Sequence, residues 1–486
     1  MKNLRRSLGF AFAERYLIIC LQLLSFTLLA RLLTPQQIGL YSVSMALISV
    51  AQVVRDFGLS NYLIQRKSLD ADDVGTALGM SMILGIFLFG GVMLGAPLVG
   101  QFYNDPSLTA IVRIIALNFL ILPFNSILIA LMRRDMEFNV LMRINVCAAL
   151  VSTSVTIGLA WAGFGPWSLA CGEVTSNLAI AAGIGAAGSW RRLQRPRLSR
   201  WRTILSFGGP LTMANIVTSV SMDINDLVVG KVLNFTQVAI SSRAQGLMNL
   251  FHRDIMGPIR AVAYPAFAQA NREGDALEAK FESSLKAVTA IAWPFYGFMG
   301  MFALETLRLM FGPQWDQSAR LVPLFCLAGA FSALVSLVPT VMLAAGHARL
   351  VSVADLIIQP VKAVVLCLVV YYYRDLMPFT IAFLGMAIVA VPYFFIVKQR
   401  VLPTDFPALA SSLGQNLMLA IGTLAPAYLI ALWQRPANGA LPLPLYLLCI
   451  ALTAASWALS LKLLRHPLYH EGMNIITARF ARKITS

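Results

Sequence analysis

Eight basic side chains lie inside long apolar stretches of the sequence, where a charge is expensive. A charged residue near the centre of a membrane helix costs about 2.5–3.5 kcal/mol. Eight such residues facing lipid would together cost more than the roughly 5–15 kcal/mol by which a typical domain is stable. Most of them must therefore face a hydrated interior or the headgroup region, where a guanidinium group is well suited to bind an anion.

These eight residues differ in their depth within the apolar stretches. The four main candidates for a cationic cavity are Arg31, Arg243, Arg320 and Lys362. The other four lie near the ends of predicted helices, where a long side chain can reach the headgroups; they are further candidates for the same cavity, namely Arg55, Arg113, Arg253 and Arg260.

Acidic residues also lie in apolar stretches, and two of them could bind an ion. Asp223 and Asp226 are spaced i, i+3, so that a helix places both carboxylates on one face beside Asn225. One carboxylate of such a pair could hold a proton or a cation, which makes both residues candidates for ion coupling. An ion pair with a neighbouring helix is the alternative that this spacing leaves open.

Other chemistry has little support in the sequence. It contains no P-loop, its six cysteines form no CxxC pair, and its one close histidine pair, His466 and His470, is interpreted as solvent-exposed. We therefore expect no metal, no cofactor and no enzymatic activity. A membrane glycosyltransferase would need an outward-facing carboxylate such as Asp105 or Asp316, but both residues are explained by turns.

Composition sets the class of protein. Of 486 residues, 58% are hydrophobic and 12% are charged, with a mean hydropathy of +0.73, which excludes a soluble enzyme. A spanning helix needs about 20 apolar residues, and on that basis the chain predicts an all-α integral membrane protein with about fourteen transmembrane helices. The net charge of +16 is then expected to face membrane lipids rather than nucleic acid.

Basic residues alternate along the loops and predict the orientation. If both termini are cytoplasmic, the outer loops contain only four basic residues, and the others lie in the cytoplasmic tails, in the inner loops or within the helices. The four outer residues are Lys231, Arg308, Arg374 and Arg435. The most basic inner loop, residues 190–202, contains six arginines and is interpreted as an anchor on anionic lipid.

A weak internal repeat suggests two lobes. At an offset of 200 residues, Arg31 corresponds to Lys231 and Gln37 to Gln237. We therefore expect two six-helix lobes related by pseudo-twofold symmetry. The predicted parts are an N-terminal lobe at 1–189, a basic cytoplasmic linker at 190–202, a C-terminal lobe at 203–400, two additional helices at 401–463 and a basic cytoplasmic tail at 464–486.

Three stretches carry a family resemblance. The run from Ala30 to Tyr41, the following Arg55-Asp56-Phe57-Gly58, and Asp226-Leu227-Val228-Val229-Gly230-Lys231 resemble bacterial polysaccharide exporters. These are Wzx-type flippases of the polysaccharide transport family, within the multidrug/oligosaccharidyl-lipid/polysaccharide exporter superfamily. The opening is most similar to the exopolysaccharide branch that includes succinoglycan and colanic-acid exporters.

That resemblance implies a function. The substrate would be an oligosaccharide repeat unit linked to undecaprenyl pyrophosphate, moved across the bacterial inner membrane by alternating access around a cationic cavity. The partners it implies are membrane lipids, the polysaccharide polymerase and the glycosyltransferases of the same pathway. A lipid II flippase and a multidrug or cation antiporter of the same superfamily remain as alternatives.

Overall fold

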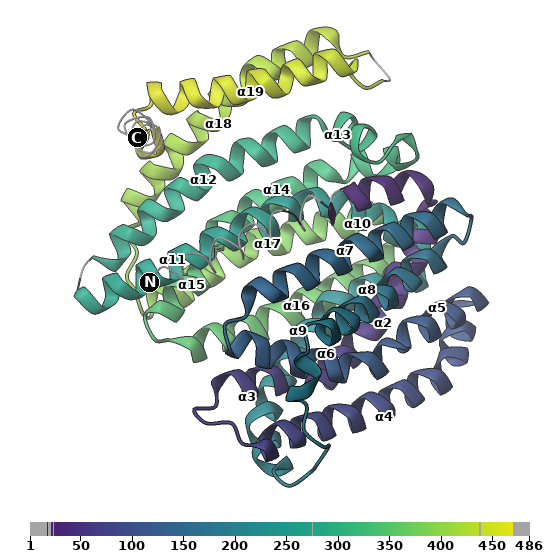
Figure 1. Ribbon diagram of the computed structural model, residues 1–486. Helices are drawn as coiled ribbons and strands as arrows, with labels where there is room; N and C mark the ends of the chain where they lie inside the picture. The colour runs from purple at the N-terminus through teal and green to yellow at the C-terminus, as the bar shows by residue number, and fades with distance from the viewer. Residues whose placement is uncertain (1–16, 18–20, 23, 275, 437–438, 470–486) are drawn as a thin grey trace, which may run out of the picture. The chain divides into compact units, whose positions relative to one another are not determined.

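The computed structural model describes residues 17, 21–22, 24–274, 276–436 and 439–469. These residues form helices and no β-strand, which confirms the predicted all-α fold (Figure 1). Two compact units divide the chain. The first unit consists of Met1–Ala239 and Gln359–Arg374, and the second consists of Ile240–Ile358 and Asp375–Ser486. The lobe boundaries expected from the sequence describe a different division and stay a prediction.

Ten helices among the described residues are long and apolar enough to cross a membrane. An eleventh span results if α12 (Leu277–Met301) and α13 (Ala303–Met310), which meet at a bend of 82°, count as one. Five residues of the first predicted span, 16, 18–20 and 23 of 16–33, lie outside the described residues. The protein is thus a multi-pass membrane protein, but the predicted number of about fourteen helices is not confirmed.

The first unit contains the N-terminal helices. Residues 24–32 are helical, and the chain continues through α2 (Pro35–Asp56), α3 (Leu59–Gln65), α4 (Ala71–Tyr103), α5 (Pro106–Ala116), α6 (Asn118–Arg134), α7 (Phe138–Trp161), α8 (Pro166–Ala186), the 3-10 helix η1 (Ser189–Arg192) and α9 (Trp201–Val232). The start of α2 is fixed locally, because Thr34 and Gln37 form a reciprocal capping box around Pro35.

α2 packs closely against α9 and the beginning of α10 (Phe235–Asn249), and glycine makes this possible. A Cβ atom on Gly39 would lie 1.7 Å from the carbonyl oxygen of Phe235, and one on Gly208 would lie 2.1 Å from that of Phe57. Only a residue without a side chain allows the backbones to approach so closely. Since the two contacts pair opposite ends of the helices, α2 and α9 run antiparallel along their length.

Ion pairs hold the basic loop before α9 against the acidic start of α4. Arg200 lies 2.9 Å from both Asp70 and Asp73, and Arg197 pairs with Asp72. Hydrogen bonds to Asp73 and Asp70 raise the pKa of Arg200 above its usual value. Together with Arg192, which pairs with carboxylates at positions 135 and 137, three of the six arginines of this loop form ion pairs within the protein. These ion pairs within the protein are additional to the predicted role of loop 190–202 as an anchor on anionic lipid.

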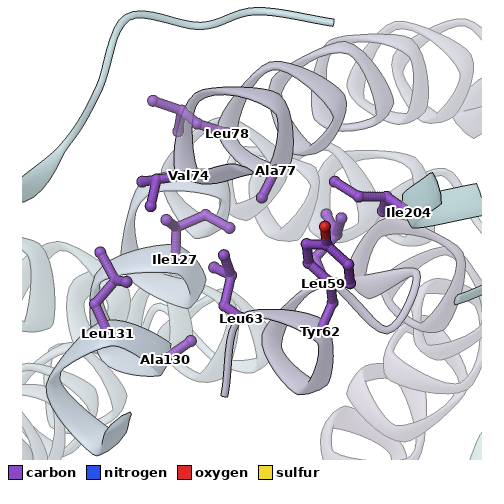
Figure 2. Close-up of a cluster of buried hydrophobic side chains, with 10 residues drawn as sticks. All are labelled: Leu59, Tyr62, Leu63, Val74, Ala77, Leu78, Ile127, Ala130, Leu131 and Ile204. Carbon is purple, nitrogen blue, oxygen red and sulfur yellow. The ribbon is translucent and has the colours of Figure 1, made fainter. Parts of the chain in front are cut away.

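A hydrophobic cluster lies beside this ion-pair network. Figure 2 shows its ten side chains, contributed by α3, α4, α6 and α9, pointing toward one another. Tyr62 belongs to the cluster and also donates a hydrogen bond of 3.0 Å from its hydroxyl group to Asp73. The cluster therefore joins the apolar packing of four helices to the ion pairs of the loop.

The second unit contains the remaining helices. They are most of α10, the π-helix η2 (Leu250–Ile255), α11 (Met256–Glu273), α12, α13, the 3-10 helix η3 (Pro313–Arg320), α14 (Val322–Val335), α15 (Val338–Ala344), part of α16 (Ala348–Tyr373), α17 (Leu376–Gln399), α18 (Phe406–Gln434) and α19 (Leu443–Leu463). The last two form a hairpin (Figure 1). Glu305 on α13 fastens that hairpin, because its carboxylate accepts from Arg435 at 2.9 Å and from the backbone nitrogen of Leu441 at 3.1 Å.

The histidine that follows α19 corrects one expectation. His466 is only 3% exposed, and burial together with the charge of Lys286 lowers its pKa to about 4. The interpretation of His466 as solvent-exposed is therefore wrong, because the side chain is enclosed and its Nδ1 accepts a hydrogen bond of 3.3 Å from the backbone nitrogen of Leu468. His470, its predicted neighbour, lies outside the described residues.

Candidate functional site

The structure places the eight basic residues of the apolar stretches in different surroundings. Four lie in each unit. Arg55 and Arg243 are buried, with exposed fractions of 8% and 5%. Two are partly exposed, namely Arg260 and Lys362. The remaining four are exposed: Arg31, Arg113, Arg253 and Arg320.

Two of these placements differ from the expectations. Arg320 ends the 3-10 helix η3 and precedes the span that starts at Val322, so it does not lie inside an apolar helix. Arg55, expected to reach the headgroups from a helix end, is buried instead. The reason is that the chain turns back at Phe57, whose left-handed φ of 40° ends α2, and α9 covers this turn.

Arg55 is a buried cation with two unsatisfied nitrogen atoms. Its Nε and Nη1 atoms have no hydrogen-bond partner among the residues that the structure describes. A buried charge without hydrogen bonds costs several kcal/mol, so such a group is retained only where something offsets that cost. An anionic ligand that enters beside the last turn of α2 would do so, because the guanidinium fork matches two oxygen atoms of a phosphate.

Arg243 is stabilised differently. Its guanidinium carbon lies 5.0 Å from the ring centre of Trp315 and 5.4 Å from that of Phe311, both in the second unit. The aromatic faces attract the cation and hold it in place. Arg260 in turn donates to the backbone oxygen of His252 at 3.0 Å and so satisfies a carbonyl of the π-helix. Arg253 pairs with Asp254 at 3.0 Å and is largely exposed.

The acidic pair of α9 has oxygen-bearing neighbours. Asp223 accepts hydrogen bonds from Ser49 of α2 and, at 3.2 Å, from Ser219 of α9. Asp226 lies close enough to Asp223 to repel it, and the amide oxygen of Asn225 is buried without a partner among the described residues. This arrangement offers carboxylate, hydroxyl and amide oxygens to a proton or a hard cation.

Sequence reasoning missed Ser49 and Ser219. Ser49 is separated from Asp223 by 174 positions, so that only the packing of α2 on α9 brings them together. A hydroxyl residue within an apolar stretch is a weak signal, because serine in a membrane helix usually bonds to its own backbone. Ser49 does this as well, at 2.9 Å from the oxygen of Ala46.

A separate apolar cavity of about 810 Å³ lies in the second unit between α12, α14 and α18. Trp293, Tyr296 and Gly300 line one wall. Leu327 and Ile421 line the others and are themselves 47% and 60% exposed, so the cavity opens toward the lipid-facing surface of the unit. With almost exclusively apolar walls, it fits a hydrocarbon chain and no charged group.

Fold and composition together define an all-α multi-pass membrane protein. A family model described as "Polysaccharide biosynthesis protein" matches residues 28–320, more than half of the chain. The protein therefore belongs to this family of polysaccharide biosynthesis proteins, and the resemblance that the sequence showed to polysaccharide exporters is confirmed.

Two curated relatives agree with this assignment. The lipopolysaccharide biosynthesis protein WzxC of Escherichia coli (strain K12) is 28% identical over 323 residues, which cover 64% of this chain and 64% of that protein. The succinoglycan biosynthesis transport protein ExoT of Rhizobium meliloti (strain 1021) is 20% identical over 320 residues, which cover 65% of this chain and 64% of that protein. The chain thus matches less than two thirds of the length of either relative.

A solved structure shares the whole fold. The inward closed conformation of the lipid II flippase MurJ superposes with a TM-score of 0.76, covering 95% of this chain and 99% of that chain at 12% sequence identity. At that identity the likeness shows the fold alone. It extends beyond the segment matched by the family model and includes the C-terminal hairpin of α18 and α19.

The surroundings of Arg55 predict that its buried charge lowers the stability of the folded protein. Replacing it with methionine, as Arg55→Met, should raise the free energy of unfolding by about 1–4 kcal/mol, because a buried charge without a partner is removed. Thermal unfolding of the purified protein in detergent measures this change.

Arg134→Met is the matched control. Arg134 donates to the backbone oxygens of Leu63 at 2.8 Å and Arg66 at 2.6 Å, so its loss should lower the free energy of unfolding by about 1–3 kcal/mol. If Arg55→Met destabilised the protein as much as Arg134→Met does, Arg55 would be a structural residue and not a ligand site.

Proposed function

We propose that this protein translocates oligosaccharide repeat units linked to undecaprenyl pyrophosphate across the bacterial inner membrane during exopolysaccharide biosynthesis. The family supports a role in polysaccharide biosynthesis, and the fold shared with a lipid II flippase supports the transport of a lipid-linked saccharide. The observation that carries the proposal is Arg55, a buried guanidinium group whose Nε and Nη1 atoms have no hydrogen-bond partner among the described residues. Transport of this kind is not enzymatic, and both termini are proposed to be cytoplasmic.

The pyrophosphate group requires cationic partners in a place from which most water is excluded. We assign Arg55 to this role first, because it combines burial with unsatisfied donors. Arg31, Arg243, Arg320 and Lys362 are the other proposed members of the cationic cavity. Alternating access would expose this cavity first to the cytoplasm and then to the periplasm. The glycosyltransferases of the pathway would act before this step and the polymerase after it.

A deletion strain tests the function directly. We expect repeat units linked to undecaprenyl pyrophosphate to accumulate on the cytoplasmic side and surface polysaccharide to disappear, measured by lipid extraction with mass spectrometry and by polysaccharide analysis. Complementation with Arg55→Ala should restore less than a tenth of the export, and Arg31→Ala, Arg243→Ala, Arg320→Ala and Lys362→Ala should each reduce it. Arg195→Ala, at an exposed site on the basic loop, is the control and should export normally.

The same strain separates the alternatives. Accumulation of lipid II with loss of viability would replace this function by that of a lipid II flippase. Normal surface polysaccharide with a changed sensitivity to toxic cations would replace it by a multidrug or cation antiporter. Normal export by the alanine variants at normal protein levels would contradict the cationic cavity while leaving the substrate in place.

The acidic pair of α9 is proposed to couple transport to an ion gradient. Asp223→Asn combined with Asp226→Asn should abolish the dependence of export on the gradient, because an amide neither releases a proton nor neutralises a cation. Uptake of a lipid-linked oligosaccharide into proteoliposomes, with and without an imposed proton or sodium gradient, measures it. Asp105→Asn is the control, since Asp105 caps α5 and asparagine caps a helix equally well. An unchanged gradient dependence in the double variant would eliminate this coupling site.

The apolar cavity of the second unit is proposed to hold part of the polyprenyl chain while the headgroup crosses. A side chain at Gly300 would enter the cavity without a backbone clash, because its Cβ atom would lie 3.6 Å from the nearest atom, the Cα of Pro323. Gly300→Phe should therefore lower export at least fivefold at a normal protein level. Gly385→Phe, on α17 where no atom lies within 4 Å of the Cβ position, is the control. Equal export by the two variants would show that the chain stays outside this cavity.

A further inference from the structure

An enclosed carboxylate at the start of α4 joins three segments of the first unit. Asp73 is 0% exposed, and its Oδ1 atom lies 3.1 Å from Nη1 of Arg66 and 2.9 Å from Nη1 of Arg200. The hydroxyl group of Tyr62 donates to the same oxygen at 3.0 Å, and the backbone nitrogen of Asp70 donates to Oδ2 at 3.2 Å. These four donors satisfy the carboxylate, so that it needs no ligand of its own.

Two of the donors belong to α3, a helix of only seven residues. Tyr62 lies within α3, and Arg66 follows its last turn as the C-cap. An isolated helix of this length is not stable, because the few hydrogen bonds that it forms do not offset the cost of its first turn. The position of α3 is therefore set by tertiary contacts, which include the bonds to Asp73 and the packing of its apolar side chains in the cluster of Figure 2.

The turn that buries Arg55 leads directly into α3. After α2 ends at Asp56, Phe57 and Gly58 adopt left-handed backbone conformations, with φ angles of 40° and 67°, and α3 begins at Leu59. Phe57 also packs against the cluster that contains the side chains of α3. A displacement of α3 would therefore be passed through a turn of two residues to the last turn of α2, which contains Arg55.

Such a support is needed because the burial of Arg55 is unfavourable in itself. Its Nε and Nη1 atoms are enclosed and have no hydrogen-bond partner among the described residues. A guanidinium group in this state gains free energy when it turns toward water. A fixed position of α3 opposes that movement and keeps the two nitrogen atoms available to an anion.

The basic loop before α9 is part of the same support. Its backbone is bonded to α4, because the nitrogen of Arg197 donates to the oxygen of Gly75 at 3.0 Å. The hydroxyl groups of Ser199 and Thr76 lie 3.2 Å apart and add a second link between the loop and α4. Arg200 therefore reaches the carboxylate at the start of α4 from a loop that is itself held in place.

We propose that Asp73 is a positioning residue for the anion site of Arg55. It holds α3 through Tyr62 and Arg66, and α3 in turn holds the end of α2 at which Arg55 is buried. Asp73 does not contact the anion. The inference rests on the proposed function, because it requires that Arg55 bind the pyrophosphate group of the substrate.

Binding of inorganic pyrophosphate to the purified protein tests this role. Isothermal titration calorimetry in phosphatidylcholine nanodiscs measures the affinity at a temperature at which every variant is folded, and the unfolding temperatures are measured separately. Asp73→Asn keeps the size of the side chain but removes the charge that attracts both arginines. It should weaken pyrophosphate binding by about fivefold or more, and Asp73→Glu should bring the affinity back to within about twofold of the natural protein.

A double variant separates positioning from a purely structural role. Arg55→Ala should weaken binding by about tenfold or more, and Asp73→Asn added to it should weaken binding no further, because both changes act on one site. Tyr62→Phe removes a single hydroxyl group and should weaken binding by about two- to threefold, which keeps the test available if Asp73→Asn does not fold.

Tyr103→Phe is the matched control. The hydroxyl group of Tyr103 donates to the backbone oxygen of Leu227 at 3.0 Å and so joins the other end of α4 to α9. Its loss should lower the unfolding temperature and leave the affinity for pyrophosphate unchanged.

Three results would overturn the positioning role while the anion site stays in place. They are a natural affinity in Asp73→Asn, a loss of affinity that Tyr103→Phe shares, and a further loss when Asp73→Asn is added to Arg55→Ala. Failure of the proposed function has a different signature. In that case Arg55→Ala binds pyrophosphate as tightly as the natural protein does, and no anion site exists at Arg55 for Asp73 to position.

Discussion

A bilayer offers no hydrogen bonds, so every polar group within it must be satisfied by the protein or by what the protein binds. The contacts of the structure follow from this constraint. The buried Lys398, which is fully enclosed, bonds to Glu278 at 2.6 Å and to Thr404 at 2.8 Å, with the ring of Phe281 at 4.6 Å. Groups that are satisfied in this way hold helices together, and they need no ligand.

The same constraint explains why the helices could be predicted so well and their number less well. Apolar runs separated by short polar segments indicate the ends of α4, α7 and α17 to within a few residues, because polar side chains are unfavourable in lipid. α9 and the segment from α10 to α11 contain charged residues, such as Asp223 and Arg243, that the packing of neighbouring helices accommodates. Length and hydropathy alone do not classify α9 or the segment from α10 to α11 as spans, since composition does not show the contacts that a neighbouring helix makes with their charged residues.

The sequence predicts which residue types could form the site, but not how they are arranged. The sequence shows that basic and acidic residues lie in apolar stretches, but it does not show which of them are buried. Arg55 is separated from the glycine-lined contact with α9 by about 150 residues, and Arg320 lies in a short 3-10 helix that resembles the start of an apolar span. Whether each arginine is buried, as Arg55 is, or exposed, as Arg320 is, depends on tertiary packing, which an apolar pattern does not encode.

Arg55 and Arg243 illustrate how buried arginines with the same charge can differ in the surroundings that the protein gives them. The guanidinium group of Arg243 lies over two aromatic rings, which stabilise its charge. Arg55 has no comparable partner for its Nε and Nη1 atoms. It lies in the last turn of α2, and α9 packs over this end of the helix. The proposed role of Arg55 requires that bound cargo be released again, which is easier when the protein leaves some of the donors of this residue unsatisfied. The cost of leaving such donors open in the empty protein is therefore also what makes binding of an anion favourable.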